Sequence, residues 1–294
     1  AWIGARLAAR GLHPILATLV VLVTIAASSH HFHVRPHLGS IVLLGVTFAL
    51  LCDVEAARVR VLRLAWLVPL FVLWTNVHGG VLAGVASVGL FVGVWTLWRL
   101  AQIATGSSRD AASDLRPFPT PLDRRCKRAV AWLVTAGGGA AILVNPYGLE
   151  MVEAWLAILR MPLTGLIEEH RALDVTRPEG VVTVVIGLAY LALLADAVRT
   201  RGWRQVHATW ILPLVWLLLA WSRVRHAPLF AAVGALATAE MLPYSRIAAW
   251  LARYDLFQAR EGNVATDARF NWRAGLIPLA LAAAAVVFQH QHLP

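Results

Sequence analysis

Continuous apolar runs separated by short polar segments dominate the chain. A helix needs about 20 apolar residues to cross a bilayer, with a range of about 17–25. Backbone groups in lipid must be hydrogen-bonded within their own segment, so each run predicts a helix, whereas a membrane β-barrel would need alternating segments. The runs predict nine membrane spans, at residues 14–29, 38–52, 61–77, 79–101, 128–145, 180–198, 208–222, 226–242 and 273–289.

Two of the separators are very short. Gly79 and Gly80 predict a tight hairpin between two spans, and Ser222 to His226 predict a second tight turn. Pro69 and Pro213 lie inside predicted spans, and each should kink its helix because proline has no N–H to donate. The shorter spans can reach across the bilayer if flanking residues snorkel or the bilayer thins locally.

The pattern favours a single all-α transmembrane domain over residues 1–294. The polar segment 102–127 contains three prolines and predicts a cytoplasmic linker. Residues 146–179 predict an extracytoplasmic loop, and within it residues 149–160 have the amphipathic pattern of an interfacial helix. Residues 244–260 have the same amphipathic pattern.

Composition supports a polytopic membrane protein. Of the 294 residues, 59% are apolar and 14% are charged, and 13 are tryptophan. Mean hydropathy is +0.66. Soluble domains are about 25% charged and about 45–50% apolar. These values exclude a soluble enzyme and a disordered chain, and Cys52 and Cys126 provide no disulfide framework.

The basic residues predict the topology. The formal net charge is +10, and in a membrane protein such charge belongs to cytoplasmic loops rather than to a nucleic-acid site. With a cytoplasmic N-terminus, 20 of the 26 Lys and Arg residues fall in cytoplasmic segments. We therefore expect a multi-pass protein of the cytoplasmic (inner) membrane that contacts lipid and does not bind nucleic acid.

Histidines and acids gather on the predicted extracytoplasmic side. The loop 146–179 holds six acidic residues, and nine of the eleven histidines lie on that side. These histidines are His30, His31, His33, His37, His78, His170, His226, His290 and His292. Topology selection acts weakly on His and acids. Their grouping is explained either by chance or by a polar site that faces this side.

Two motifs at helix ends are candidate binding turns. In Trp74 to Gly80, Asn76 and His78 are either hydrogen-bond donors to a substrate or parts of a solvated turn anchored by Trp74. Asn145 and Tyr147 belong to an Asn-Pro-Tyr-Gly turn. That turn either stops a helix or also lays residues 149–160 along the membrane as one wall of a cavity.

Two charged clusters are candidate chemical groups. Glu168 and Glu169, beside His170, are a candidate base, a candidate oxygen site for a divalent cation, or simply solvated charges. Arg223 and Arg225 precede His226 on a predicted extracytoplasmic turn. Arginine suits bidentate phosphate binding, and the alternative is contact with lipid headgroups.

The cluster His30 to His37 contains four histidines. It has no cysteine and no i, i+4 pair that is fixed on a helix, so it predicts no defined metal site. Arg35-Pro36 is interpreted instead as the start of a helix.

The order of these motifs resembles a group of bacterial polytopic membrane proteins, which in turn are similar to the GT-C superfamily of glycosyltransferases. The match rests on Arg35-Pro36, Trp74 to Gly80, Asn145 to Gly148 and Arg223 to Phe230, and it spans most of the chain. The resemblance implies a GT-C-like helical bundle. It also implies a sugar donor linked to polyprenyl phosphate, an extracytoplasmic acceptor, and a cavity between the helices and an outside loop.

The resemblance also assigns roles. Glu168 or Glu169 would be the catalytic base or a metal ligand. The phosphate and sugar would be bound by Arg35, Asn76, His78, Asn145, Tyr147, His170, Arg223, Arg225 and His226. GT-C enzymes usually have an acid in the first outside loop, whereas residues 30–37 contain none. Three explanations stay open: that loop lies upstream of Ala1, the chain uses Glu168 or Glu169 instead, or the chain is not a transferase. The sequence requires no cofactor.

Two other functions fit the same spans. A transporter would need internal repeats and polar groups near the bilayer centre, whereas Asp196 and Glu240 are the only acids inside spans and lie near cytoplasmic ends. A non-catalytic membrane assembly protein would scatter the extracytoplasmic polar residues. A transferase would gather them around one pocket.

Overall fold

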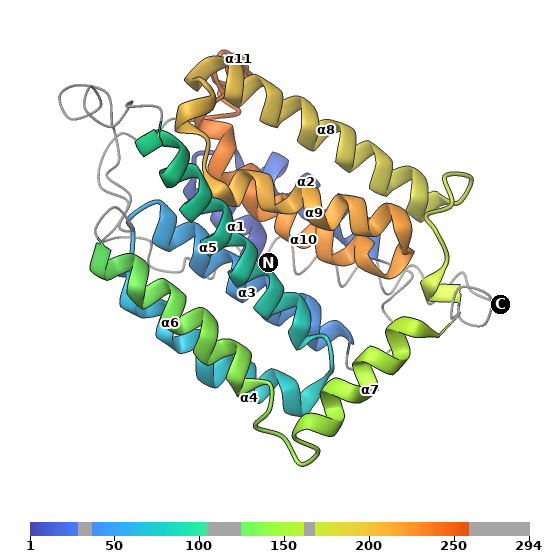
Figure 1. Cartoon of the computed structure of the whole chain (residues 1–294). Coiled ribbons are helices and arrows are strands. Elements are labelled where there is room, and N and C mark those ends of the chain that lie inside the picture. Colours follow the sequence, from blue (N-terminus) through green and yellow to red (C-terminus); the bar gives the residue numbers. More distant parts are fainter. Residues whose placement is uncertain (29–36, 105–124, 162–167, 259–294) are drawn as a thin grey trace. The chain divides into compact units, whose positions relative to one another are not determined.

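The computed structural model describes residues 1–28, 37–104, 125–161 and 168–258 (Figure 1). These residues form helices and turns, with no β-strand among them. They divide into two compact units, which are described separately below. Of the described residues, unit 1 comprises 1–28, 172–206 and 216–258, and unit 2 comprises 37–104, 125–161, 168–171 and 207–215.

Unit 1 is built around helix α10 (Ala227–Met241), which packs against α1 (Trp2–Ala9), α2 (Pro14–Ser28) and α8 (Pro178–Arg201). Every residue of α10 except Thr238 is buried. Seven of its fifteen residues are Ala or Gly, and such small side chains allow close helix packing in membranes. The unit is completed by the short elements η6 (Trp203–Gln205), η7 (Val224–His226), η8 (Leu242–Tyr244) and α11 (Arg246–Ala252).

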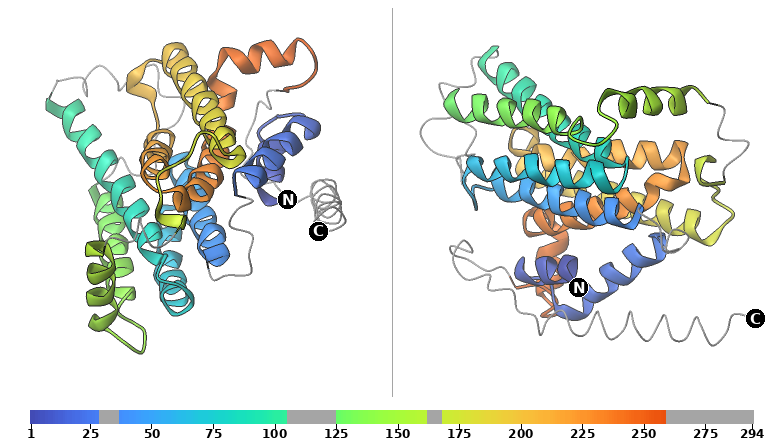
Figure 2. Two further views of the ribbon diagram at one scale, coloured as in Figure 1. Left: turned by 90° about the vertical axis from the view of Figure 1, so that its right-hand side faces the viewer. Right: turned by 90° about the horizontal axis from the view of Figure 1, so that it is seen from below.

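Unit 2 is a bundle of helices that run alongside one another (Figure 2). Its helices are α3 (His37–Glu55), η2 (Val61–Trp66), α4 (Leu67–Val77), α5 (Val81–Ala104), α6 (Arg125–Ala141), α7 (Leu149–Arg160) and η5 (Glu168–His170). Helix α3 packs on α4 and α5, and α6 packs on both α4 and α5. Helix α9 (Ala208–Ser222) contributes its first half to unit 2 and its second half to unit 1.

Among the residues that the structure describes, four helices are long and apolar enough to cross a membrane. They cover His37–Glu55, Val81–Trp98, Pro178–Arg201 and Val224–Tyr244, and three shorter apolar helices cover Pro14–Ser28, Val61–Val77 and Ala208–Ser222. Large apolar side chains on these helices are exposed, with Leu218 at 72%. Such surfaces are typical of a helical membrane protein, because water would disfavour them and lipid would not.

Eight of the nine predicted spans fall on described helices. Seven of them correspond to the long and short apolar helices, and the span 128–145 corresponds to α6, which ends at Ala141. The ninth, 273–289, lies outside the described residues. Part of the predicted linker 102–127 is helical, because α5 continues to Ala104 and α6 begins at Arg125, while residues 105–124 are not described.

The predicted span 61–77 changes its helix type close to Pro69. The span begins as the 3-10 helix η2 and becomes the α-helix α4 at Leu67, so that Pro69 falls in the first turn of α4. Proline has no N–H for the carbonyl four residues earlier, and its ring clashes with that carbonyl in a continuous α-helix. Pro213, in contrast, lies inside α9.

Residues of one predicted membrane side share one end within each unit. In unit 2, the start of α3 meets the turn before α5, and the end of α3 meets the start of α9. In unit 1, Leu173 N–H donates to the Trp221 carbonyl before α8, and the end of α8 meets Arg246. Which membrane side each of these ends faces stays a prediction.

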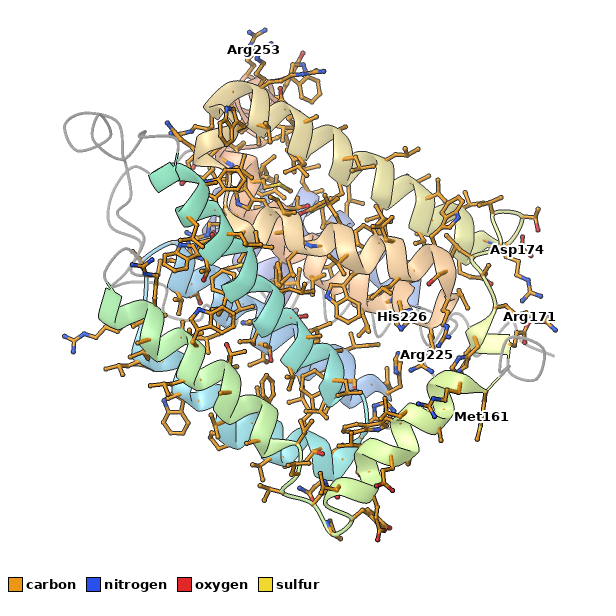
Figure 3. All side chains as sticks on the ribbon, viewed as in Figure 1. Met161, Arg171, Asp174, Arg225, His226 and Arg253 are labelled. Carbon is orange, nitrogen blue, oxygen red and sulfur yellow. The ribbon has the colours of Figure 1, made fainter. Side chains whose placement is uncertain are left out.

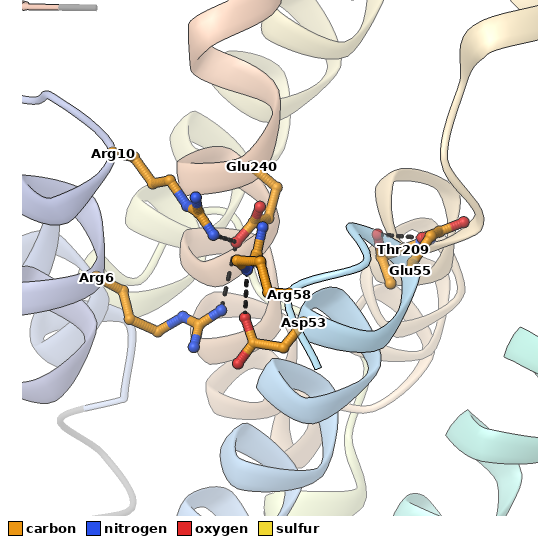
Figure 4. A network of polar contacts seen from close by, with 7 residues as sticks. All are labelled: Arg6, Arg10, Asp53, Glu55, Arg58, Thr209 and Glu240. Carbon is orange, nitrogen blue, oxygen red and sulfur yellow. Dashed lines mark hydrogen bonds and ion pairs between the residues drawn. The ribbon is translucent and has the colours of Figure 1, made fainter. Parts of the chain in front are cut away.

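Partly buried ion pairs and a buried cap connect the other ends of these helices (Figure 4). In unit 1, Arg6 and Arg10 of α1 each contact one Glu240 carboxylate oxygen, at 3.3 and 3.2 Å. In unit 2, the Glu55 carboxylate is 3% exposed and accepts the backbone N–H groups of Ala208 and Thr209 and the Thr209 hydroxyl. Glu55 thereby caps α9 from another helix, which satisfies N–H groups that a helix start leaves open.

Candidate functional site

The Trp74 to Gly80 motif forms a hydrogen-bonded turn in unit 2. The Trp74 indole Nε1–H donates to Ser40 Oγ at 2.9 Å, and Ser40 Oγ lies 2.7 Å from His78 Nδ1. The Gly80 backbone N–H also donates to His78 Nδ1, at 3.0 Å. Ser40 and Trp74 are fully buried, while His78 is partly exposed. The His78 imidazole therefore lies at the end of a series of hydrogen bonds whose other members, Trp74 and Ser40, are buried.

Both glycines of this turn lie where side-chain atoms of other residues approach the backbone closely. A Cβ on Gly80 would collide with Ser40 Oγ and would lie 2.7 Å from His78 Nδ1. A Cβ on Gly79 would lie 2.7 Å from Nε1 of Trp155, which is on α7. Only glycine brings the backbone this near to Ser40 and to Trp155. The Gly-Gly pair thus joins three elements: α3, the α4–α5 turn and α7.

Asn76 and Thr75 tie the same turn to the end of α6. Asn76 Nδ2 donates to the carbonyls of Val72 and Val144, at 2.7 and 2.8 Å. The Thr75 hydroxyl donates to the Ile142 carbonyl at 3.1 Å. The carbonyls of Ile142 and Val144 follow the last turn of α6, where helical acceptors have no partner of their own. Asn76 therefore orders the backbone, a role that neither sequence interpretation had included.

The Asn145 to Gly148 turn follows directly. Asn145 Nδ2 donates to the Ile142 carbonyl at 2.8 Å, and Asn145 Oδ1 accepts the Tyr147 N–H at 2.8 Å. This Asx turn and the positive φ of 51° at Gly148 redirect the chain into α7 (Figure 1). The Tyr147 side chain is 63% exposed. The structure thus brings the two predicted motifs together as one end of unit 2, which we call the clasp: Ser40, residues 74–80, residues 142–148 and Trp155.

Helix α7 matches the predicted segment 149–160 residue for residue. Its exposed surface carries Leu149, Leu156 and Ile158 together with Glu150 and Glu153. This mixture of apolar and acidic residues is typical of a helix in the headgroup region. The other segment predicted to be amphipathic, 244–260, contains only the short helix α11 and turns as far as residue 258.

Glu168, Glu169 and His170 form the single 3-10 turn η5 in unit 2. Glu168 is exposed and Glu169 is partly exposed, whereas His170 is buried at 5% exposure. Adjacent carboxylates beside a buried imidazole fit the predicted base or cation ligand. Within the described residues, however, no group of three His, Cys, Asp or Glu side chains gathers as a metal site.

Arg223, Arg225 and His226 form a second polar turn, in unit 1, where η7 leads into α10 (Figure 3). The Arg223 N–H donates to the Leu219 carbonyl at 2.9 Å, and His226 Nδ1 lies 3.1 Å from the same carbonyl. A carbonyl only accepts, so Nδ1 of His226 carries a proton. All three side chains are partly buried. The Arg223 guanidinium makes no ion pair or side-chain hydrogen bond with other described residues.

The loop before α8 lies at the same end of unit 1, since Leu173 bonds to Trp221. The hydroxyl and the N–H of Thr176 both donate to Asp174 Oδ1, at 2.6 and 2.9 Å. These bonds, with the Arg177 charge as a smaller cause, hold the pKa of Asp174 below its ordinary value. Asp174 is therefore ionised at neutral pH and orders the loop next to the arginine turn.

The predicted site residues thus form three local groups. Asn76, His78, Asn145 and Tyr147 belong to the clasp, Glu168 to His170 form η5, and Arg225 and His226 lie in η7, which Arg223 directly precedes. Arg35 lies outside the described residues. Sequence reasoning missed Ser40, Thr75 and Trp155. Ser40 was detectable only as a polar residue near the start of an apolar run, and Trp155 had been assigned to the membrane surface.

The chain gives no significant match to protein-family models, to curated proteins or to solved structures.

Proposed function

We propose that this chain is a multi-pass membrane glycosyltransferase of GT-C type that transfers a sugar from a polyprenyl phosphate to an extracytoplasmic acceptor. The reaction class comes from the motif resemblance. The observation that carries the proposal is the arginine turn η7, which delivers Arg223, Arg225 and His226 to the N-terminus of the buried helix α10.

This turn has the chemistry of a phosphate site. The guanidinium of Arg223, which has no partner among the described residues, is partly buried, so a charged ligand is favoured there. Helix α10 begins at Ala227 with its positive dipole end beside the turn, and no side chain caps that end. The phosphate oxygens of the lipid would contact both the Arg223 guanidinium and the N-terminus of α10. The polyprenyl chain would lie against apolar helices.

In this proposal, the C1–O bond between sugar and phosphate breaks as the acceptor hydroxyl attacks C1. Glu168 or Glu169 takes the acceptor proton, and the departing phosphate keeps the bonding electrons. Arg223 and Arg225 stabilise the charge that grows on this phosphate, and such stabilisation is often the largest catalytic term. His78 and His226 hydrogen-bond the sugar or the phosphate.

The first test is binding of undecaprenyl phosphate to the purified full chain. We expect Arg223→Ala and Arg225→Ala to weaken binding about 10- to 100-fold each, as expected for loss of a charge-assisted hydrogen bond of about 1.5–3 kcal/mol. Arg223→Lys should recover only part of the affinity, because lysine lacks the planar fork. The matched control is Arg253→Ala, which removes an exposed arginine from the α11 end of unit 1.

The second test is transfer of label from polyprenyl-phosphate-linked sugars to membrane acceptors, in which Glu168→Gln and Glu169→Gln are compared with the parent chain. One of the two should lose at least about 100-fold in rate, since general base catalysis contributes about 10²–10⁴-fold. Full activity in both variants would remove these carboxylates from the mechanism. Normal lipid binding and transfer by an Arg223→Ala/Arg225→Ala double variant would refute the proposed phosphate site.

A further inference from the structure

The apolar helix Val61–Val77 begins with the 3-10 helix η2, whose repeat of three residues separates buried from exposed side chains. Val61, Leu64 and Leu67 follow one another at this interval, and all three are buried. Because a 3-10 helix has three residues per turn, side chains three residues apart lie one above the other. The buried residues therefore form one face of η2, which packs against α3 and α6.

One of the exposed faces holds two arginines and a tryptophan, which we call the basic row: Arg60, Arg63 and Trp66. The Arg63 backbone N–H donates to the Arg60 carbonyl at 2.9 Å, so one 3-10 turn separates the two arginines. A second turn, with a rise of about 6 Å, separates Arg63 from Trp66. All three side chains are exposed, with Trp66 at 68%.

The positive charges of the basic row are not neutralised by its described neighbours. Neither guanidinium makes an ion pair or a side-chain hydrogen bond within the part of the chain that the structure describes. Arg58, in contrast, has its Nε 2.7 Å from Asp53 Oδ1. The backbone N–H groups of Arg58 and Val59 also donate to the Asp53 carbonyl. These bonds order the turn before η2, while the charges of the basic row remain exposed.

An exposed apolar stripe continues the basic row along α4. Pro69, Leu73 and Val77 follow Trp66 at intervals of three and four residues, which places them on one side of an α-helix. All three are exposed, with Leu73 at 57% and Val77 at 49%. The surface is thus cationic at one end and apolar along the rest. The charged headgroup and the acyl chains of an anionic phospholipid follow each other in the same order.

We propose that the basic row and this apolar stripe are a docking site for an anionic phospholipid of the membrane that the chain spans. Arg60 and Arg63 bind the phosphate of the headgroup, for which the planar guanidinium is well suited. Trp66 lies at the boundary between headgroups and hydrocarbon, where tryptophan is enriched in membrane proteins. The acyl chains lie along the stripe. An acidic peptide would match the two arginines but not the apolar stripe, so the observations favour a lipid.

Two double variants test the charges of this site. Arg60→Ala/Arg63→Ala removes both charges, whereas Arg60→Lys/Arg63→Lys retains them. The matched control, Arg171→Ala/Arg253→Ala, removes two other exposed arginines, one directly after η5 and one at the end of α11. Because all four arginines are exposed, every variant should unfold at the temperature of the parent chain.

A third variant, Trp66→Ala, tests the boundary between headgroup and hydrocarbon. It retains both arginines but removes the exposed indole that links them to the apolar stripe. We expect this variant to bind anionic and zwitterionic phospholipids more weakly by the same factor, because both lipids have the same acyl chains.

Equilibrium binding to the purified full chain in detergent is measured with three probes. Short-chain phosphatidylglycerol has an anionic headgroup, phosphatidylcholine of the same chain length is zwitterionic, and glycerol phosphate has no acyl chain. The parent should bind phosphatidylglycerol most tightly and glycerol phosphate most weakly. Arg60→Ala/Arg63→Ala should weaken phosphatidylglycerol binding at least about ten-fold, since one arginine near an anionic surface contributes about five-fold. Its affinity for phosphatidylcholine should stay within about two-fold of the parent.

The lysine variant and the arginine control should bind phosphatidylglycerol within about three-fold of the parent. Parent-like binding by Arg60→Ala/Arg63→Ala, or an equal loss in the control, would overturn the proposed site. Equal affinity of the parent for the two phospholipids would overturn recognition of charge. Glycerol phosphate that binds as tightly as phosphatidylglycerol would reveal a site for free phosphate and overturn the lipid assignment. None of these outcomes depends on sugar transfer, whose tests alter other residues.

Discussion

At position 80, the neighbouring side chains leave room for glycine but not for a larger residue. Its Cα lies so near to Ser40 Oγ and His78 Nδ1 that a methyl group cannot be added without displacing them. Two other glycines of unit 2 are under no such constraint. A methyl group added to Gly93 of α5 or to Gly139 of α6 would meet no atom within 4 Å. Glycines at different positions should therefore respond oppositely to the same change.

We predict that Gly80→Ala destabilises the chain by about 1–3 kcal/mol, the usual cost of overpacking. Gly93→Ala should be neutral or stabilise by up to about 1 kcal/mol, because alanine is the better helix former. Thermal unfolding in detergent compares the two variants with the parent. Equal unfolding temperatures for Gly80→Ala and Gly93→Ala would contradict the close packing of the clasp.

At the scale of elements, helices are fixed to one another through their ends. The side chains of Asn76 and Thr75 satisfy carbonyls at the end of α6, and Glu55 caps the start of α9. In unit 1, Glu240 of α10 holds both arginines of α1. A helix end in an apolar environment lacks water as a partner, so these polar side chains replace it.

Glu55→Ala should cost about 1–3 kcal/mol, because two N–H groups and one hydroxyl lose a buried charged acceptor. The control is Glu150→Ala, since Glu150 is exposed on α7. Hydrogen exchange at Ala208 and Thr209 gives the local measurement and should accelerate in Glu55→Ala alone. Unchanged exchange at both amides would show that Glu55 does not cap α9.

Glu240→Ala should cost about 1–3 kcal/mol, because it leaves the partly buried Arg6 and Arg10 without the carboxylate they share. A matched variant, Glu179→Ala, removes an acid near the start of α8 that takes part in no ion pair with a described side chain. Urea unfolding of both variants measures the difference. Equal midpoints would mean that the pair contributes nothing to unit 1.

The sequence predicted elements better than contacts. The apolar runs located the longer described helices but not α1, and the Asn-Pro-Tyr-Gly signal placed the turn before α7 correctly. Pro69 was expected to kink a helix, and the chain instead changes from 3-10 to α-helix there. Ser40 was missed because its hydrogen-bond partners, His78 and Trp74, are more than thirty residues away in sequence and meet it only in the folded chain. No local pattern encodes such a contact.

At the scale of the whole molecule, the account depends on which loops share a membrane side. Within unit 2, the clasp residues gather at one end of α3, and Glu55 lies at the other end. Within unit 1, Leu173 and the arginine turn gather at one end of α8, and Asp196 lies near the other. The proposed function requires that the clasp and the arginine turn face the same compartment.

Accessibility of single cysteines in a Cys52→Ser/Cys126→Ser background tests this requirement most directly. Exposed positions are chosen in the clasp (Tyr147), in the loop before α8 (Val175), in the arginine turn (Ser222) and at the opposite ends (Ala57 and Thr200). A membrane-impermeant maleimide should label the first three in intact cells, and the last two only after permeabilisation. Labelling of Tyr147→Cys and Ser222→Cys from opposite sides would contradict the account.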